Sequence, residues 1–379
     1  MKIVIAIDSF KGCMTSSQAG EAAKAGILRV LPDADVIVRP MADGGEGTVD
    51  ALAAGRVKED AAAEVQGPLG DPVSAKYAVL DGSTAVMEMS AASGITLVRK
   101  DQLNPYKTST YGVGQMIKDA LDRGCREIIL GIGGSATNDG GAGMLQALGF
   151  ELLDEEGSPI PLGAEGLGKL SEIRTENVDS RLSECRIRVV SDVGNPLTGE
   201  QGSSAVFGPQ KGATPEMVKQ LDQWLSHYAE VSSACVKDAD PDYPGSGAAG
   251  GLGFALRTFL NAELVPGVDL VLDFTGMEEV VKDADYLITG EGQLDRQTVM
   301  GKAPSGIAGL GEKYDIPVLA FSGSVTDDAR YCNDHGITAF FPILRRICSL
   351  EEAMDTETAQ KNMADTAEQV FRVISAGQK

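Results

Sequence analysis

The alternation of short apolar runs with helical patterns constrains the fold of this sequence more than any other feature. Several of the apolar runs are nearly continuous in Val, Ile and Leu, which is typical of parallel strands that are covered on both faces. Strands that alternate with helices along the chain predict an α/β fold. The candidate strands are residues 2–7, 35–39, 84–89, 127–130, 188–191, 286–289, 318–322 and 338–341.

The length of the chain, 379 residues, exceeds what one hydrophobic core usually organises, so two domains are expected. Turn-rich segments at residues 67–72 and 159–163 mark changes in pattern, and strand–helix alternation returns at residues 285–342. We therefore predict that the first and last parts of the chain share one doubly wound parallel sheet, while a middle portion forms a second, mixed α/β domain. The predicted division assigns residues 1–58, 105–148 and 276–379 to the first domain, and residues 59–104 and 149–275 to the second. Amphipathic helices are predicted at residues 215–228 and 350–374.

The charge of the chain limits its partners. A formal net charge of -22 argues against nucleic-acid or anionic-membrane binding, because both need a basic surface. The six cysteines are scattered without metal-type spacing, which fits reduced thiols better than a disulfide framework. The apolar run at residues 1–7 is too short for a signal peptide, and no later run approaches membrane-spanning length. We expect a cytoplasmic protein that acts on small molecules.

A glycine-rich segment, residues 131–143, follows the apolar run at 128–130 and leads into a helical pattern at 144–148. Glycines let the main chain approach a ligand closely, and free N–H groups at a helix N-terminus favour a phosphate or carboxylate. The segment therefore predicts a site for an anionic small molecule. The alternative is a purely structural role, since glycines also serve tight turns.

Two other functions remain open at this point. Residues 131–136 fit the G-x-G-x-x-G/A dinucleotide pattern, and Asp154 lies near the position of a ribose-binding acid, so a dehydrogenase is the first alternative. The second is a module that binds an acid without turning it over. The phosphate-loop pattern is absent, because residues 299–304 have a Gly-Lys pair without the hydroxyl residue or the preceding glycine spacing.

Acidic residues recur among the glycines that follow the predicted strands. One or two carboxylates that hold magnesium, and another that accepts a hydroxyl proton, are what a phosphoryl transferase needs. Ligands of open α/β sheets bind beyond the carboxyl ends of the strands, so these loops are expected to converge on one crevice. The alternative for each single acid is helix capping or a turn. The acids are Asp8, Asp43, Glu46, Asp139, Asp192, Glu291 and Asp295, and the nearby cations are Lys11, Lys211 and Lys302.

Eight blocks of the sequence, in order and spread over nearly the whole chain, resemble the signature blocks of the bacterial class I glycerate kinases. Such a series is far more specific than any single glycine motif, and the one small departure is Met89, where leucine is expected. The blocks are residues 7–12, 41–48, 88–94, 110–114, 131–143, 191–197, 207–213 and 289–295.

The resemblance implies ATP-dependent transfer of the γ-phosphoryl group to a hydroxyl of D-glycerate. The 2-hydroxyl is expected rather than the 3-hydroxyl, so the products are 2-phosphoglycerate and ADP, formed in organic acid catabolism with Mg²⁺ as the cofactor. The resemblance also implies that the split domain is Rossmann-like and that the active site lies in the interdomain cleft.

The requirements of phosphoryl transfer to an alcohol indicate a role for each candidate residue. Transfer to an alcohol needs in-line placement, charge neutralisation, a proton acceptor and a cradle for the acid's own carboxylate. We expect Asp192 to accept the proton, with Lys11 and Asp139 as further catalytic residues. The expected cradle for glycerate is Ser9, Lys11, Gly44 and Gly45; the nucleotide phosphates are expected at Gly133, Gly134, Ser135, Asn138 and Lys211; and the expected metal residues are Asp43, Glu291 and Asp295, with Asp139 as a further candidate. Residues 244–253 are expected to form a hinge or lid, or a second anion loop.

Overall fold

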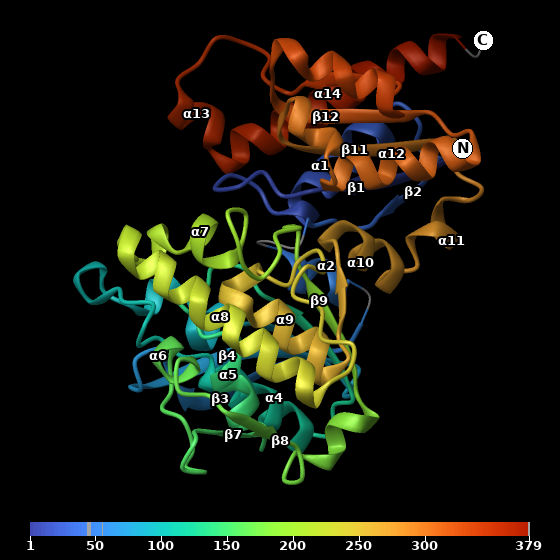
Figure 1. Cartoon of the computed structure of the whole chain (residues 1–379). Coiled ribbons are helices and arrows are strands. Elements are labelled where there is room, and N and C mark those ends of the chain that lie inside the picture. The colour runs from blue at the N-terminus through green and yellow to red at the C-terminus, as the bar shows by residue number, and fades with distance from the viewer. Residues whose placement is uncertain (44–46, 55, 378–379) are drawn as a thin grey trace. The chain divides into compact units, whose positions relative to one another are not determined.

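The computed structural model describes residues 1–43, 47–54 and 56–377, and the chain divides into two compact units (Figure 1). Unit 1 is formed by Met1–Gly55 and Pro266–Lys379, and unit 2 by Arg56–Val265. Both units contain parallel strands joined through helices, which confirms the predicted α/β class.

Unit 1 is built on a five-stranded sheet in the order β13-β12-β11-β1-β2, and all of its strand pairs are parallel. In Figure 1 the blue strands β1 and β2 lie beside the orange strands β11 and β12, although about 250 residues separate them in sequence (286 minus 38). Its elements are β1 (Lys2–Ile7), α1 (Ser16–Leu28), β2 (Asp35–Val38), α2 (Thr48–Ala53), α10 (Gly267–Phe274), α11 (Met277–Val281), β11 (Tyr286–Leu294), α12 (Ala303–Tyr314), β12 (Val318–Val325), β13 (Ala339–Pro342), α13 (Leu350–Met354) and α14 (Thr356–Gly377).

Helices cover both faces of this sheet. On one face, Ile3 and Ile5 of β1 share a buried cluster with Phe371 of α14 and with residues of α1. The two helices approach closely because α1 has glycine at position 26, where a Cβ would lie 2.0 Å from the carbonyl oxygen of Ala364. On the other face, α12 packs on β12. Unit 1 is therefore a doubly wound sheet.

The strand order of unit 1 locates its ligand-binding edge. From β1 the chain continues to β2 on one side, whereas β11, β12 and β13 follow on the other side. The neighbouring strands β1 and β11 thus form a topological switch point, where ligands of such sheets bind beyond the carboxyl ends. Asp8 directly follows β1, and Glu291 lies within β11 next to that end.

Unit 2 has a six-stranded sheet in the order β10-β9-β6-β5-β4-β3, in which β10, β9, β6 and β5 are parallel while β4 and β3 form an antiparallel hairpin. One face of the sheet carries the largest buried cluster, which includes Met87, Leu130 and Val189 together with residues of α4, α5 and α9. Its elements are β3 (Lys58–Gln66), β4 (Pro72–Leu80), β5 (Thr84–Glu88), α3 (Ser90–Ser93), α4 (Tyr111–Asp122), β6 (Glu127–Gly131), α5 (Ala142–Ala147), β7 (Glu151–Leu153), α6 (Ala164–Leu167), β8 (Glu172–Arg174), β9 (Arg186–Val190), α7 (Ser203–Phe207), α8 (Pro215–Cys235), α9 (Ala248–Leu260) and β10 (Glu263–Val265).

The predicted division of the chain needs a correction at residues 105–148. This segment was assigned to the first domain, but β6 pairs with β5 and β9 and so belongs to unit 2. A buried parallel strand has the same apolar pattern in either sheet, so its own sequence does not reveal its partners. The turn at residues 67–72, interpreted as a crossing between domains, instead joins β3 to β4.

Two predicted helices are present with altered bounds. The helix predicted at 215–228 continues to Cys235, and the one predicted at 350–374 is interrupted at Asp355, between α13 and α14.

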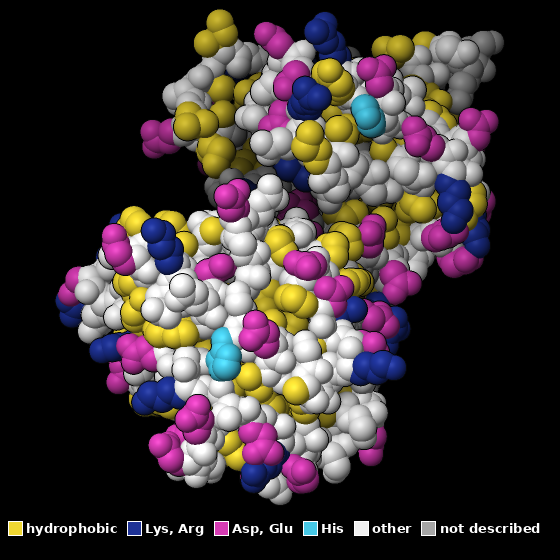
Figure 2. All heavy atoms as spheres, in the orientation of Figure 1, with side chains coloured by type: hydrophobic (Ala, Val, Ile, Leu, Met, Phe, Trp, Pro, Cys, Tyr) yellow, Lys and Arg dark blue, Asp and Glu magenta, His cyan; other side chains and the backbone are white. Residues whose placement is uncertain are grey.

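Among the described residues, no helix is long and apolar enough to cross a membrane. Acidic side chains are spread over the visible face of the molecule and outnumber the basic ones there, in agreement with the net charge of -22 (Figure 2).

Candidate active site

In unit 1 the chain leaves β1 through a loop that holds a buried carboxyl group and a free hydroxyl group. Burial raises the pKa of Asp8 to about 7, although its carboxylate accepts a hydrogen bond of 2.6 Å from the N–H of Ser9. The Ser9 Oγ atom is buried and has no hydrogen-bond partner among the described residues. A buried polar group without a partner is costly, and this hydroxyl is free to form a hydrogen bond with a ligand.

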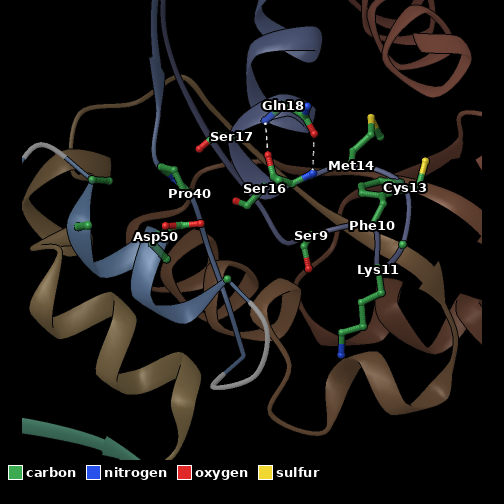
Figure 3. A pocket seen from close by; sticks show the side chains of 16 residues that line it. Ser9, Phe10, Lys11, Cys13, Met14, Ser16, Ser17, Gln18, Pro40 and Asp50 are labelled. Carbon is green, nitrogen blue, oxygen red and sulfur yellow. Dashed lines mark hydrogen bonds between the residues drawn. The ribbon is translucent and has the colours of Figure 1, made fainter. Parts of the chain in front are cut away.

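A cavity of about 550 Å³ lies beside this loop (Figure 3). The side chains of Ser9 and Lys11 point to the same side of the loop. The Lys11 ammonium is largely exposed and lies 3.9 Å from the Asp43 carboxylate. Gly44 and Gly45, the other two residues of the predicted glycerate cradle, lie outside the described residues. The cavity is lined by residues 9–18, Pro40, Gly47, Asp50, Ala51, Ala53 and Ala54.

The three residues predicted to hold a metal have different surroundings. Glu291 is buried, accepts a hydrogen bond of 2.7 Å from Thr298 and pairs with Lys302 at 3.2 Å. Asp295 caps a short 3₁₀-helix by accepting from the N–H of Gln297. Helix capping is the structural alternative to metal binding that the sequence left open for each acid. Asp43 is the salt-bridge neighbour of Lys11. Within residues 1–43, 47–54 and 56–377, no group of three or more His, Cys, Asp or Glu side chains is arranged to hold a metal ion.

In unit 2 the glycine-rich segment begins with an exposed turn. Gly133 and Gly134 are exposed, and Gly134 has a φ of +71°, a left-handed conformation that favours glycine. The turn is anchored by the Gly134 carbonyl, which accepts from the N–H of Ile95, and Ser135 behind it is mostly buried. The main chain at Gly133 and Gly134 is therefore the part of the segment that a ligand can reach.

The helix N-terminus at the end of the segment is not available to an anion, which corrects the sequence-based interpretation. Helix α5 has only six residues, and the N–H groups of Ala142, Gly143 and Met144 already have partners in Asp139 and Thr110. The Asp139 carboxylate accepts from the N–H groups of Gly141 and Gly143, each at 3.3 Å, and from the N–H and hydroxyl of Thr110 at 2.8 and 2.9 Å. Asp139 is fully buried. This geometry fits a residue that shapes the loop from inside and does not fit a magnesium ligand or a group that touches substrate.

The side chains of Asn138 and Lys211 are also buried. The Asn138 amide is fully buried and donates to the Ser204 hydroxyl at 3.0 Å. Lys211 is 1% exposed, and its ammonium donates to the Thr137 carbonyl at 2.6 Å. Burial lowers the pKa of Lys211 to about 7, against the opposing influence of Asp139. Both residues were predicted to bind the nucleotide phosphates, but neither side chain reaches the surface in this structure.

Residues 244–253 support the same loop. Ala249, Gly250 and Gly251 all have positive φ, and the N–H of Gly140 donates to the Gly250 carbonyl at 2.9 Å. A Cβ at Gly250 would lie 2.0 Å from the Thr137 carbonyl oxygen, so only glycine allows this approach. The segment packs against the glycine-rich loop.

Two acidic residues lie at or just beyond the ends of the strands on either side of β6, the strand that leads into the exposed turn. Asp192 is exposed and follows β9, whose last residue Val190 pairs with Gly131 of β6. On the other side of β6, Glu88 ends β5 and also pairs with Gly131. Glu88 lies in one of the eight sequence blocks but has no role among the sequence-based predictions; its position near the end of a predicted strand is the signal that could have identified it.

The fold and these groups define a class of protein. Unit 1 carries a pocket with a free hydroxyl and an ammonium group, which suit a small acid, while unit 2 carries an exposed main-chain turn after β6. Such groups are typical of an α/β enzyme that acts on small anionic molecules.

Comparisons with known proteins then give the family. Residues 3–375 match the model of the glycerate kinase family, and the chain belongs to this family. It is 49% identical to a glycerate kinase from Halalkalibacterium halodurans, with 96% of this chain and 97% of that protein covered. It is 44% identical to a glycerate 2-kinase from Escherichia coli K12, covering 100% and 99%. The crystal structure of a candidate glycerate kinase 2 from Salmonella typhimurium LT2 matches with a TM-score of 0.91 and 46% identity, covering 100% of this chain and 99% of that one.

The dehydrogenase alternative loses its support. Residues 132–141 separate β6 from α5, so no helix begins directly after the first glycines as a dinucleotide-binding turn requires. The family match confirms the resemblance to glycerate kinases that the eight sequence blocks indicated.

Proposed function

We propose that this protein is an ATP-dependent glycerate kinase that phosphorylates the 2-hydroxyl of D-glycerate and releases ADP. The observation that carries the proposal is the full-length similarity to a protein named glycerate 2-kinase, at 44% identity over 100% of this chain. The six cysteines are all unpaired, which supports a cytoplasmic location for the reaction.

Residues of unit 1 bind glycerate, and residues of unit 2 bind the nucleotide. In unit 1, the Ser9 hydroxyl and the Lys11 ammonium bind the carboxylate of glycerate, since both can donate to it and Ser9 Oγ has no other partner among the described residues. In unit 2, the main-chain N–H groups of Gly133 and Gly134 bind phosphate oxygens. Asp139, Asn138 and Lys211 hold this turn in shape from inside and are positioning residues.

The reaction itself forms one bond and breaks another. The 2-hydroxyl oxygen of glycerate attacks the γ-phosphorus while the bond from that phosphorus to the bridging oxygen breaks, and the electron pair leaves with ADP. Asp192 accepts the hydroxyl proton. Magnesium, when bound with the nucleotide, neutralises charge on the phosphates; carboxylates and a phosphate-binding turn in unit 2 fit such an ion, because magnesium in kinases is bound by one or two carboxylates with phosphate and water.

The test is ADP release from ATP and magnesium on addition of single hydroxy acids. D-glycerate is expected to release ADP, and 3-hydroxypropionate, which lacks the 2-hydroxyl, is expected to release none. Turnover that requires NAD, or binding of glycerate without ADP release, would replace the proposal with one of the two alternatives considered from the sequence.

Lys11→Ala is expected to raise the KM for glycerate by about 10–100-fold, because a charge-assisted hydrogen bond contributes about 1.5–3 kcal/mol. The KM for ATP is expected to stay within about twofold of the wild-type value, since the nucleotide is bound by unit 2. Steady-state kinetics with each substrate varied in turn measure both constants. Lys361→Ala, on the exposed side of α14, is the control; an unchanged KM for glycerate in Lys11→Ala would remove Lys11 from the cradle.

A further inference from the structure

Glu88 has no part in substrate binding or proton transfer as proposed above. It is the last residue of β5, at the carboxyl edge of the parallel part of the unit 2 sheet. Burial raises the pKa of Glu88 to about 7, and no neighbouring cation or hydrogen-bond donor offsets this burial among the described residues. Carboxylates in protein interiors usually have such partners. A half-buried carboxylate without one is placed to receive a positive charge from a ligand.

The structure makes room for this side chain next to the exposed turn. Glu88 and Gly131 are paired across β5 and β6, so their side-chain positions lie on the same face of the sheet. A Cβ at Gly131 would lie 2.2 Å from Glu88 Oε2. Gly131 has no positive φ, so its backbone conformation does not call for glycine, and the absence of a side chain leaves the space that the Glu88 carboxylate occupies. The carboxylate therefore lies over the strand that leads directly into Gly133 and Gly134.

Glu88 and Asp192 belong to strand ends on opposite sides of β6, the strand that leads into this turn. The register places Glu88, Gly131 and Val190 side by side at the ends of three adjacent parallel strands. Neighbouring strands are about 4.8 Å apart, so the ends of β5 and β9 are separated by roughly 10 Å. A phosphate on the turn would follow directly on the strand end that carries the Glu88 carboxylate, and a nearby carboxylate repels an anion unless a cation accompanies it.

We propose that Glu88 binds the divalent cation that accompanies the nucleotide at the Gly133–Gly134 turn. This inference rests on the proposed kinase function. A single carboxylate is sufficient, because magnesium keeps several waters and takes further ligands from the phosphates.

The experiment measures Mn²⁺ binding in the presence of ADP by electron paramagnetic resonance, with ADP binding without metal measured in parallel by equilibrium dialysis. Glu88→Gln is expected to weaken Mn²⁺ binding in the ADP complex by at least about 10-fold, as loss of a metal-site partner typically does. ADP binding without metal is expected to stay within about threefold. Glu64→Gln, an exposed glutamate on β3 of the same sheet, is the matched control and is expected to match the wild type.

A second variant moves the carboxylate without removing it. Gly131→Ala places a methyl group where Glu88 Oε2 now lies and is expected to weaken Mn²⁺ binding in the same direction as Glu88→Gln. Unchanged Mn²⁺ affinity in Glu88→Gln would overturn the inference while leaving the kinase proposal intact. Equal loss of ADP binding with and without metal would also overturn it, because Glu88 would then only support the loop. A wild-type protein that binds no nucleotide would overturn the proposed function itself.

Discussion

Asp192→Asn is expected to lower kcat by about 10²–10⁴-fold, the usual cost of removing a group that accepts a proton in the transition state. The amide keeps the size of the side chain but cannot take the proton from the 2-hydroxyl of glycerate. Asp192 is exposed in the loop after β9, so its substitution is expected to change the free energy of unfolding by no more than about 0.5 kcal/mol. The KM values for glycerate and ATP are expected to stay near those of the wild type, because the binding groups are elsewhere.

Single-turnover and steady-state rates of ADP formation measure this effect. Asp71→Asn is the matched control, since Asp71 is also an exposed aspartate in a loop of unit 2. If Asp192→Asn retained kcat within about threefold of the wild type, Asp192 would not be a proton acceptor in the sense that general-base catalysis requires.

Asp139→Ala is expected to lower the free energy of unfolding of unit 2 by at least about 3 kcal/mol. The substitution removes the acceptor for three buried N–H groups and one hydroxyl, and it leaves the buried Lys211 ammonium without its neighbouring opposite charge. Buried donors without partners carry the full cost of losing water. The expected result is a protein that unfolds at markedly lower urea concentration.

The only tryptophan of the chain, Trp224, lies in α8 of unit 2, so its fluorescence reports the unfolding of this unit. Asp71→Ala at the surface serves as the control and is expected to change stability by about 0.5 kcal/mol or less. A stable Asp139→Ala protein that had lost only its metal-dependent nucleotide binding would restore Asp139 as a magnesium ligand and contradict the role assigned here.

The elements that sequence could predict are those whose pattern is local. All eight predicted strands are present, and several of them are nearly continuous Val, Ile and Leu runs, the local pattern of parallel strands covered on both faces. The sequence did not reveal β3, whose Lys58–Gln66 segment contains three consecutive alanines and four charged residues and has low β-propensity. Its stability as a strand comes from pairing with β4, which is a tertiary effect.

For the candidate site, too, the sequence does not reveal which groups the tertiary structure buries. Glycine and acidic residues in residues 131–143 predicted an anion site, but the sequence cannot tell which of their groups face solvent. The structure leaves Gly133 and Gly134 exposed while Asp139 and Lys211 are buried. Asp139 was predicted as a catalytic residue and a candidate magnesium ligand, because carboxylates among the glycines after strands suit phosphoryl transfer, yet here it accepts from main-chain N–H groups, the other frequent use of this side chain.

The most direct test of the central claim is the position of the phosphate on the product. ³¹P nuclear magnetic resonance of a reaction with D-glycerate, ATP and magnesium is expected to show ADP together with a product whose phosphorus is split into a doublet by the single proton on C2. A triplet, from the two protons on C3, would contradict transfer to the 2-hydroxyl, and the absence of any phosphorylated acid would contradict the account as a whole.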